Sequence, residues 1–175
     1  MNIIFLNIDG VLNDKEYLES QMYHIKKYEK EFMLENYVYS NSHEINTIEY
    51  DMLRVNQEKL SMIIEVANNT NSRVVMISDW SGQYYYESFL NGLSGLGLPI
   101  VGYVDGVTPF RGHQIKEYIK DNDIHNYVIV DNELAVDYSS ELFNNLVLTD
   151  YEEGLKDRHV SIMYGVLNRH MHRRC

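Results

Sequence analysis

The sequence predicts an α/β fold in which a mostly parallel central sheet is flanked by helices. Segments whose apolar residues recur at helical spacing alternate with short apolar runs that have the length of buried strands. Polar side chains directly follow several of these runs, which is typical of a site at the carboxyl edge of a parallel sheet. The predicted strands lie at 3–6, 73–77, 99–104, 127–130 and 146–149.

Length and composition predict one globular domain spanning 1–175. The chain has 175 residues, of which 45% are hydrophobic and 23% charged, so it can bury a proper core. We expect no membrane span, because no run of about 18 apolar residues occurs. We also expect no signal peptide, and the single Cys175 has no partner for an internal disulfide. These features favour a cytoplasmic protein.

The net charge of −11 argues against binding an extended nucleic-acid duplex, since that affinity comes from many Lys and Arg contacts to phosphates. It leaves open the binding of a single phosphate, because a bound dication would reverse the local field of the acidic residues.

The first apolar run, 3–6, is followed by Asn7, Ile8, Asp9 and Gly10. The side-chain oxygens of Asn7 and Asp9 can reach one ion if the backbone turns sharply, and Gly10 permits that turn. An ordinary strand ending in a polar turn is the alternative interpretation.

The stretch Ile-Ile-Phe-Leu-Asn-Ile-Asp-Gly-Val-Leu-Asn resembles the first motif of the haloacid dehalogenase (HAD) superfamily, D-x-D-G-V/T. It is most similar to the small HAD domains of the Swiss-army-knife RNA-repair type. The resemblance implies a HAD-like Rossmannoid fold, with Asn7 standing where the nucleophilic aspartate belongs. It also implies that 14–54, with a loose helical period over 14–39 and none over 40–51, is an inserted flap or small cap over the site.

Two further motifs of the resemblance lie in the middle of the chain. A helix from about 56 to 68, capped by Asn56, precedes the strand 73–77, which delivers Ser78 to the same sheet edge as Asn7. Ser78 matches the second HAD motif, whose hydroxyl donates to a phosphate oxygen. The alternative interpretation is a serine that caps the next helix, expected at 82–93.

Arg111 opens a helix reaching about 120 and matches the third motif, normally a lysine that neutralises charge in the transition state. Lys116 is the weaker candidate for that role, and a surface arginine is the structural alternative. The strand 127–130 ends in Asp131 and Asn132, which match the fourth motif, with Asn132 in place of its second acid. A final helix is expected at 157–170.

The resemblance as a whole implies a Mg²⁺-dependent phosphomonoester hydrolase that works through an aspartyl-phosphate on a small phosphorylated substrate, a nucleotide or a nucleic-acid end. The roles that it implies are these: catalytic, Asn7, Asp9 and Arg111; substrate-binding, Gly10, Ser78 and Arg111; metal-binding, Asn7, Asp9 and Asp131.

An amide is a poor nucleophile, so the chain with Asn7 is expected to be inactive. A deliberate Asp→Asn replacement in an otherwise intact site would explain Asn7. A natural pseudoenzyme that binds a phosphorylated ligand or a protein would explain it too, and Asn132 supports that alternative. A phosphotransferase or dehalogenase is a third possibility, and Asp131 counts against the dehalogenase because that chemistry needs no magnesium ligands.

Overall fold

The computed structural model describes residues 1–35, 48–83, 85–104, 110–133 and 138–169. Residues 105–109, the tail with Cys175 and the centre of the predicted insertion lie outside these ranges.

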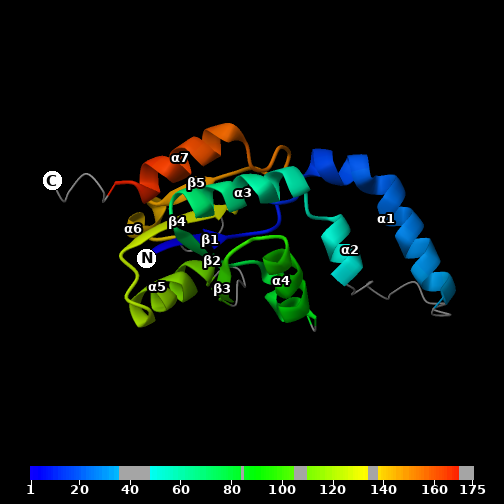
Figure 1. Ribbon diagram of the computed structural model, residues 1–175, viewed down its shortest axis with the longest axis horizontal. Helices are drawn as coiled ribbons and strands as arrows, with labels where there is room; N and C mark the ends of the chain where they lie inside the picture. Colours follow the sequence, from blue (N-terminus) through cyan, green and yellow to red (C-terminus); the bar gives the residue numbers. More distant parts are fainter. Residues whose placement is uncertain (36–47, 84, 105–109, 134–137, 170–175) are drawn as a thin grey trace.

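The centre of the protein is a five-stranded sheet with the order β3-β2-β1-β4-β5 (Figure 1). Every neighbouring pair of strands is parallel, which confirms the predicted α/β class. The strands are β1 (Asn2–Leu6), β2 (Ser72–Met76), β3 (Ile100–Tyr103), β4 (Asn126–Asp131) and β5 (Leu146–Leu148).

Helices cover both faces of the sheet and form two separate apolar cores. The larger core joins the sheet to α3 (Gln57–Asn69), α4 (Tyr86–Gly95) and α7 (Asp157–Leu167). The smaller core joins the opposite face to α5 (Arg111–Asp121) and the short α6 (Ser140–Phe143). Strand β1 supplies Ile4 and Leu6 to the first core and Ile3 and Phe5 to the second, which explains why its sequence is apolar throughout.

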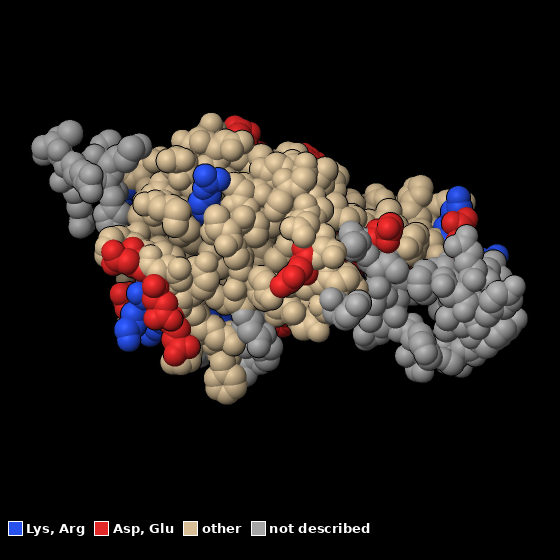
Figure 2. Space-filling view, turned by 60° about the horizontal axis from the view of Figure 1, so that its bottom comes forward, with Lys and Arg blue, Asp and Glu red and all other residues tan. Residues whose placement is uncertain are grey.

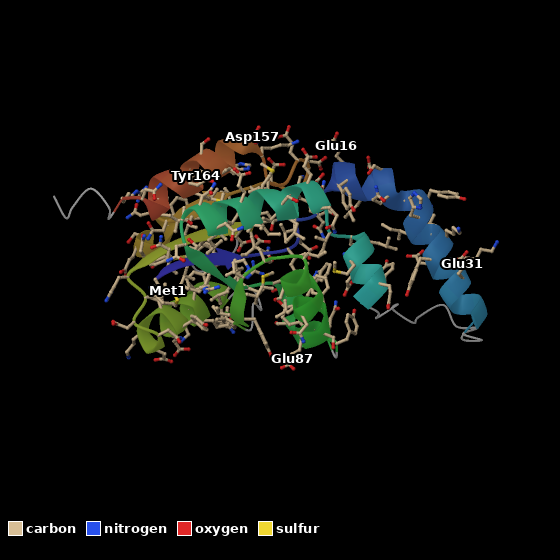
Figure 3. All side chains as sticks on the ribbon, viewed as in Figure 1. Met1, Glu16, Glu31, Glu87, Asp157 and Tyr164 are labelled. Atoms are coloured by element: carbon tan, nitrogen blue, oxygen red, sulfur yellow. The ribbon has the colours of Figure 1, made fainter. Side chains whose placement is uncertain are left out.

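Helix α3 begins where the sequence predicts it. The Asn56 side-chain oxygen accepts hydrogen bonds from the backbone amides of Glu58 and Lys59, at 2.9 and 3.3 Å. These bonds satisfy two of the amides that have no partner within a helix. Near its other end α3 contacts α7, where Asn69 Nδ2 donates to the hydroxyl of Tyr164 at 2.9 Å (Figure 3).

Two predicted helix boundaries differ from the structure by three residues or more. Helix α4 begins at Tyr86 rather than at 82, because the Ser78 oxygen accepts the Trp80 amide and starts a separate 3-10 helix, η1 (Asp79–Gly82). Helix α7 ends at Leu167, before the predicted 170. Helix α6 has only 4 residues and was not predicted, since so short a segment shows no helical period.

The segment predicted as an insertion contains α1 (Lys15–Glu35) and α2 (Ile48–Leu53). Helix α1 runs away from the sheet, with Glu16 and Glu31 along its length (Figures 1 and 3). Helix α2 contacts both α1 and α4, so it returns the chain to the body of the domain. Helix α2 overlaps the end of the stretch 40–51, where the sequence shows no clean helical period. Within the described ranges, no helix has the length and apolarity needed to cross a membrane.

Candidate active site

Asn7 and Asp131, at the ends of β1 and β4, lie at the point of the sheet where the strand order changes direction. Strand β1 pairs with β2 on one side and with β4 on the other, so the connections leaving these strands diverge between β1 and β4. Open α/β sheets bind ligands at such a point, beyond the carboxyl ends of the strands. Here the backbone N–H of Asn7 donates to the Val130 carbonyl at 3.0 Å, which brings Asn7 beside Asp131.

The chain turns sharply directly after Asn7. The backbone amides of Leu12 and Asn13 both donate to the Ile8 carbonyl, and Gly10 has a φ of 66°. Glycine adopts this left-handed conformation without the steric cost of a Cβ atom. The Gly10 carbonyl accepts the Thr149 hydroxyl at 2.6 Å, which fixes the turn to the segment that follows β5.

The Asn7 side chain is 4% exposed and makes hydrogen bonds at both ends. Its oxygen accepts the backbone amide of Ile8 at 2.8 Å. Its nitrogen donates to Asp131 Oδ1 at 2.8 Å, to Asn132 Oδ1 at 3.2 Å and to the Asp9 carbonyl at 3.3 Å. The amide therefore joins the end of β1 to the end of β4.

The Asp131 carboxylate is fully buried and accepts hydrogen bonds at both oxygens. Oδ1 accepts the Asn7 amide and the backbone amides of Asn132 and Glu133, the last two at 2.8 and 3.2 Å. Oδ2 accepts Arg111 at 2.7 Å and the Tyr138 hydroxyl at 2.6 Å. Burial raises the pKa of the Tyr138 hydroxyl, and the neighbouring Asp131 carboxylate raises that pKa further. The phenol therefore remains a donor.

Arg111 is buried at the start of α5 and contacts two carboxylates. NH1 pairs with Asp131 and NH2 pairs with Asp79 Oδ1, at 2.7 and 2.8 Å. Burial alone would lower the pKa of Arg111, but Asp131 and Asp79 outweigh it and raise the pKa above its ordinary value. Lys116, the other residue considered for the third motif, is exposed on the same helix.

Asp9 is half-buried, and its carboxylate is held by two side chains. Trp80 Nε1 donates to Oδ2 and Asn13 Nδ2 donates to Oδ1, both at 2.8 Å. Asn13 Oδ1 in turn accepts the Gly10 amide at 3.1 Å. The orientation of Asp9 is thus set by residues of the first motif and by the segment that follows β2.

Residues at the end of α2 approach this group from the predicted insertion. The Arg54 guanidinium lies over the Trp80 ring, 4.7 Å from its centroid, and 3.8 Å from Asp51 Oδ1. Asp51 is 2% exposed, and burial raises its pKa, while Tyr85 and Arg54 act to lower it and nearby Asp9 acts to raise it. Helix α2 is therefore connected to Asp9 through Trp80.

Ser78 is fully buried at the end of β2, where its oxygen caps η1. No hydrogen bond among the described residues joins Ser78 to Asn7, Asp9 or Asp131. Within the same ranges, no group of three or more His, Cys, Asp and Glu side chains is placed to hold a metal ion.

Several residues of this network were missed by reasoning from sequence. Asn13 carried a signal, since it lies four residues after Asp9 in the first motif. Trp80 follows a predicted strand, which indicates proximity without indicating the bond to Asp9. Tyr138 and Arg54 carried none, because nothing in their local pattern indicates which distant segment they contact.

The fold and this network define a class: a Rossmann-like HAD domain, with polar residues of the first and fourth motifs in contact at the sheet edge. The chain belongs to the family described as the HAD domain in Swiss Army Knife RNA repair proteins, whose sequence model matches residues 3–160. HAD proteins are in general phosphatase-type hydrolases, and the enzymes among them generally use Mg²⁺. Comparison with curated proteins and with solved structures found no match.

Proposed function

We propose that this domain carries the site of a HAD-type phosphomonoester hydrolase and that Asn7 stops the reaction before its covalent step. The contact between Asn7 and Asp131, 2.8 Å long and located where the connections diverge, carries this proposal. It joins the position that supplies the nucleophile in a HAD hydrolase to the acid of the fourth motif.

The chemistry needs a carboxylate at position 7. A carboxylate oxygen attacks phosphorus, the bond from phosphorus to the leaving oxygen breaks, and an aspartyl-phosphate forms. Asp9 gives its proton to the leaving oxygen and later takes one from the water that hydrolyses the intermediate. Trp80 and Asn13 hold Asp9 for these transfers. The Asn7 amide cannot form the acyl phosphate, so the chain stops at substrate binding.

Arg111 acts in this proposal through Asp131. Its NH1 and NH2 groups already bind Asp131 and Asp79, and its side chain is 3% exposed. It is therefore a positioning residue that holds Asp131 next to position 7. The roles expected for Gly10 and Ser78 in phosphate binding remain part of the proposal.

The donor set of this chain does not fit Mg²⁺. The residues expected to hold it were Asn7, Asp9 and Asp131, but Asn7 directs its nitrogen, not its oxygen, toward Asp131. Both oxygens of Asp131 are occupied by protein donors. We expect an oxygen ligand at position 7, and with it a metal requirement, only in Asn7→Asp.

The substrate is proposed to be a nucleotide or a nucleic-acid end rather than an extended duplex. Membership in a family of RNA-repair HAD domains supports this class of substrate. On the face shown in Figure 2, the described Lys and Arg side chains are scattered, several of them beside Asp and Glu, and they form no continuous basic surface. A surface of this kind suits one terminal phosphate better than many backbone phosphates.

A non-catalytic binding module is the second candidate, because the Asn7 network is complete within the protein. The test compares the unsubstituted chain with Asn7, called native below, with Asn7→Asp and with Asn91→Asp, which adds the same charge at an exposed position of α4. Turnover is measured with Mg²⁺ and with EDTA on nucleotides, phosphorylated oligonucleotide ends and sugar phosphates. We expect Mg²⁺-dependent hydrolysis from Asn7→Asp alone. A folded Asn7→Asp that hydrolyses none of them would favour the binding module.

A further inference from the structure

Three oxygen atoms of the protein converge on the side-chain nitrogen of Asn7. They are Oδ1 of Asp131, Oδ1 of Asn132 and the backbone carbonyl of Asp9, at 2.8, 3.2 and 3.3 Å. They come from the two segments that follow β1 and β4. Together they provide a carboxylate, an amide and a carbonyl oxygen, which are the ligand types that a hard divalent cation takes.

The orientation of the Asn7 amide follows from its hydrogen bonds. The Asn7 oxygen accepts the Ile8 amide at 2.8 Å on one side. Turning the amide over would direct that oxygen at three other oxygens and the NH₂ group at the N–H of Ile8. Neither contact has a donor and an acceptor, so only the observed orientation is satisfied.

We infer that the Asn7 amide nitrogen occupies the position of a divalent cation between the two motif segments, so that this chain assembles its site without Mg²⁺ and binds none there. The inference rests on the site assigned under the proposed function. The NH₂ group carries a partial positive charge and has hydrogens to share among the three oxygens. It therefore holds the ends of β1 and β4 together, as a bound ion would.

The charges around the site agree with this inference. Only one of the three oxygens belongs to a carboxylate, and the other oxygen of that carboxylate is paired with Arg111 at 2.7 Å. A dication would therefore meet three oxygens whose one carboxylate is already paired with a buried guanidinium.

The Asn132 side chain lies close to the first motif, and its oxygen points at the Asn7 nitrogen. A Cβ atom built on Gly10 would lie 2.4 Å from Asn132 Nδ2, so the glycine leaves the space that Asn132 fills. The amide at 132, where the resemblance expects an acid, also lowers the negative charge of the oxygen cluster. Two amides, Asn7 and Asn132, thus face each other where acids are expected, and together they form a hydrogen bond instead of a repulsive pair.

Replacing Asn7 with aspartate reverses this balance. The new carboxylate would face Asp131 across the 2.8 Å now spanned by the hydrogen bond, with no donor between them. Only a cation or a proton can restore the contact. Asn7→Asp therefore makes the stability of the domain depend on Mg²⁺, whereas the native chain is indifferent to it.

The test measures thermal unfolding and calorimetric binding of Mg²⁺ alone, with EDTA as the metal-free condition. Native protein is expected to show the same melting temperature in both conditions and no one-to-one binding. Asn7→Asp is expected to melt at least ~4 °C lower in EDTA and to recover with Mg²⁺. The exposed control Asn91→Asp should show neither change, and adding Asp131→Asn to Asn7→Asp should abolish the Mg²⁺ response.

Two results would overturn the inference. One is stoichiometric Mg²⁺ binding by the native chain that Asp131→Asn removes, which needs no Asn7 variant to fold. The other is an Asn7→Asp protein that is as stable as native in EDTA and indifferent to Mg²⁺. If Asn7→Asp binds Mg²⁺ but hydrolyses no phosphate ester, the inference stands and the proposed function fails. If the native chain binds Mg²⁺ while Asn7→Asp hydrolyses esters, the reverse holds.

Discussion

Arg111 forms two ion pairs of nearly equal length with carboxylates of very different exposure, and this allows a matched test of the site. The Asp131 side chain is 0% exposed and lies 2.7 Å from NH1, whereas Asp79 is 55% exposed and lies 2.8 Å from NH2. Removing one member of a buried pair leaves an uncompensated charge, while an exposed partner is readily replaced by water.

We expect Asp131→Asn to lower the free energy of unfolding by about 3–5 kcal/mol, the cost of breaking a buried ion pair. Donors surround both oxygens of Asp131, so the new NH₂ group would face at least two of them whichever way it turned. In a domain of this length the loss corresponds to a fall in melting temperature of roughly 10 °C.

Asp79→Asn serves as the control, with an expected loss below about 1 kcal/mol because that carboxylate is exposed. Both variants are measured by urea denaturation, with the slope of the transition compared to native. Equal losses from the two variants, or a loss below about 1 kcal/mol for Asp131→Asn, would refute the view that Arg111 is held chiefly by Asp131.

Three other substitutions test separate parts of the network. Trp80→Phe keeps an aromatic side chain but removes the indole N–H that donates to Asp9, and denaturation is expected to show a loss of about 2 kcal/mol; an unchanged midpoint would contradict that bond. Gly10→Ala places a methyl group 2.4 Å from Asn132 Nδ2 at a φ of +66°, so at least ~1 kcal/mol should be lost. Burial raises the pKa of Asp51, so native stability falls as pH rises from the unfolded pKa through the folded one. Asp51→Asn should remove that decline, so the stability of the variant relative to native should increase as pH rises. Parallel profiles of unfolding free energy against pH would contradict this.

The sheet and part of the site follow from local patterns. The runs before Asn7 and Asp131 are apolar on both faces because parallel strands are covered on both sides, so their sequences alone indicate buried strands. Polar residues at their carboxyl ends then fall at one edge of the sheet. Asn56 was equally readable, since a capping side chain acts within its own turn.

Contacts between distant segments were not readable in this way. Arg54 stacks on Trp80, 26 positions along the chain, and no periodic pattern indicates which segments will meet. Helix α2 has only 6 residues, and its contacts with α1 and α4 hold it in place rather than its intrinsic propensity. The direction of the Asn7 amide also depends on tertiary contacts, since its partners Asp131 and Asn132 lie 124 and 125 residues away.

The central claim is that position 7 is the nucleophile position of a phosphoryl-transfer site. The most direct test is the intact mass of Asn7→Asp/Asp9→Asn after incubation with Mg²⁺ and an activated aryl phosphate, whose leaving group needs no protonation. Without Asp9 to activate water, the intermediate should persist. We predict one added phosphoryl group, located at position 7 by peptide mapping, and none on the native chain or on Asp9→Asn alone. A folded double variant that gains no phosphoryl group, or gains it elsewhere, would contradict the account.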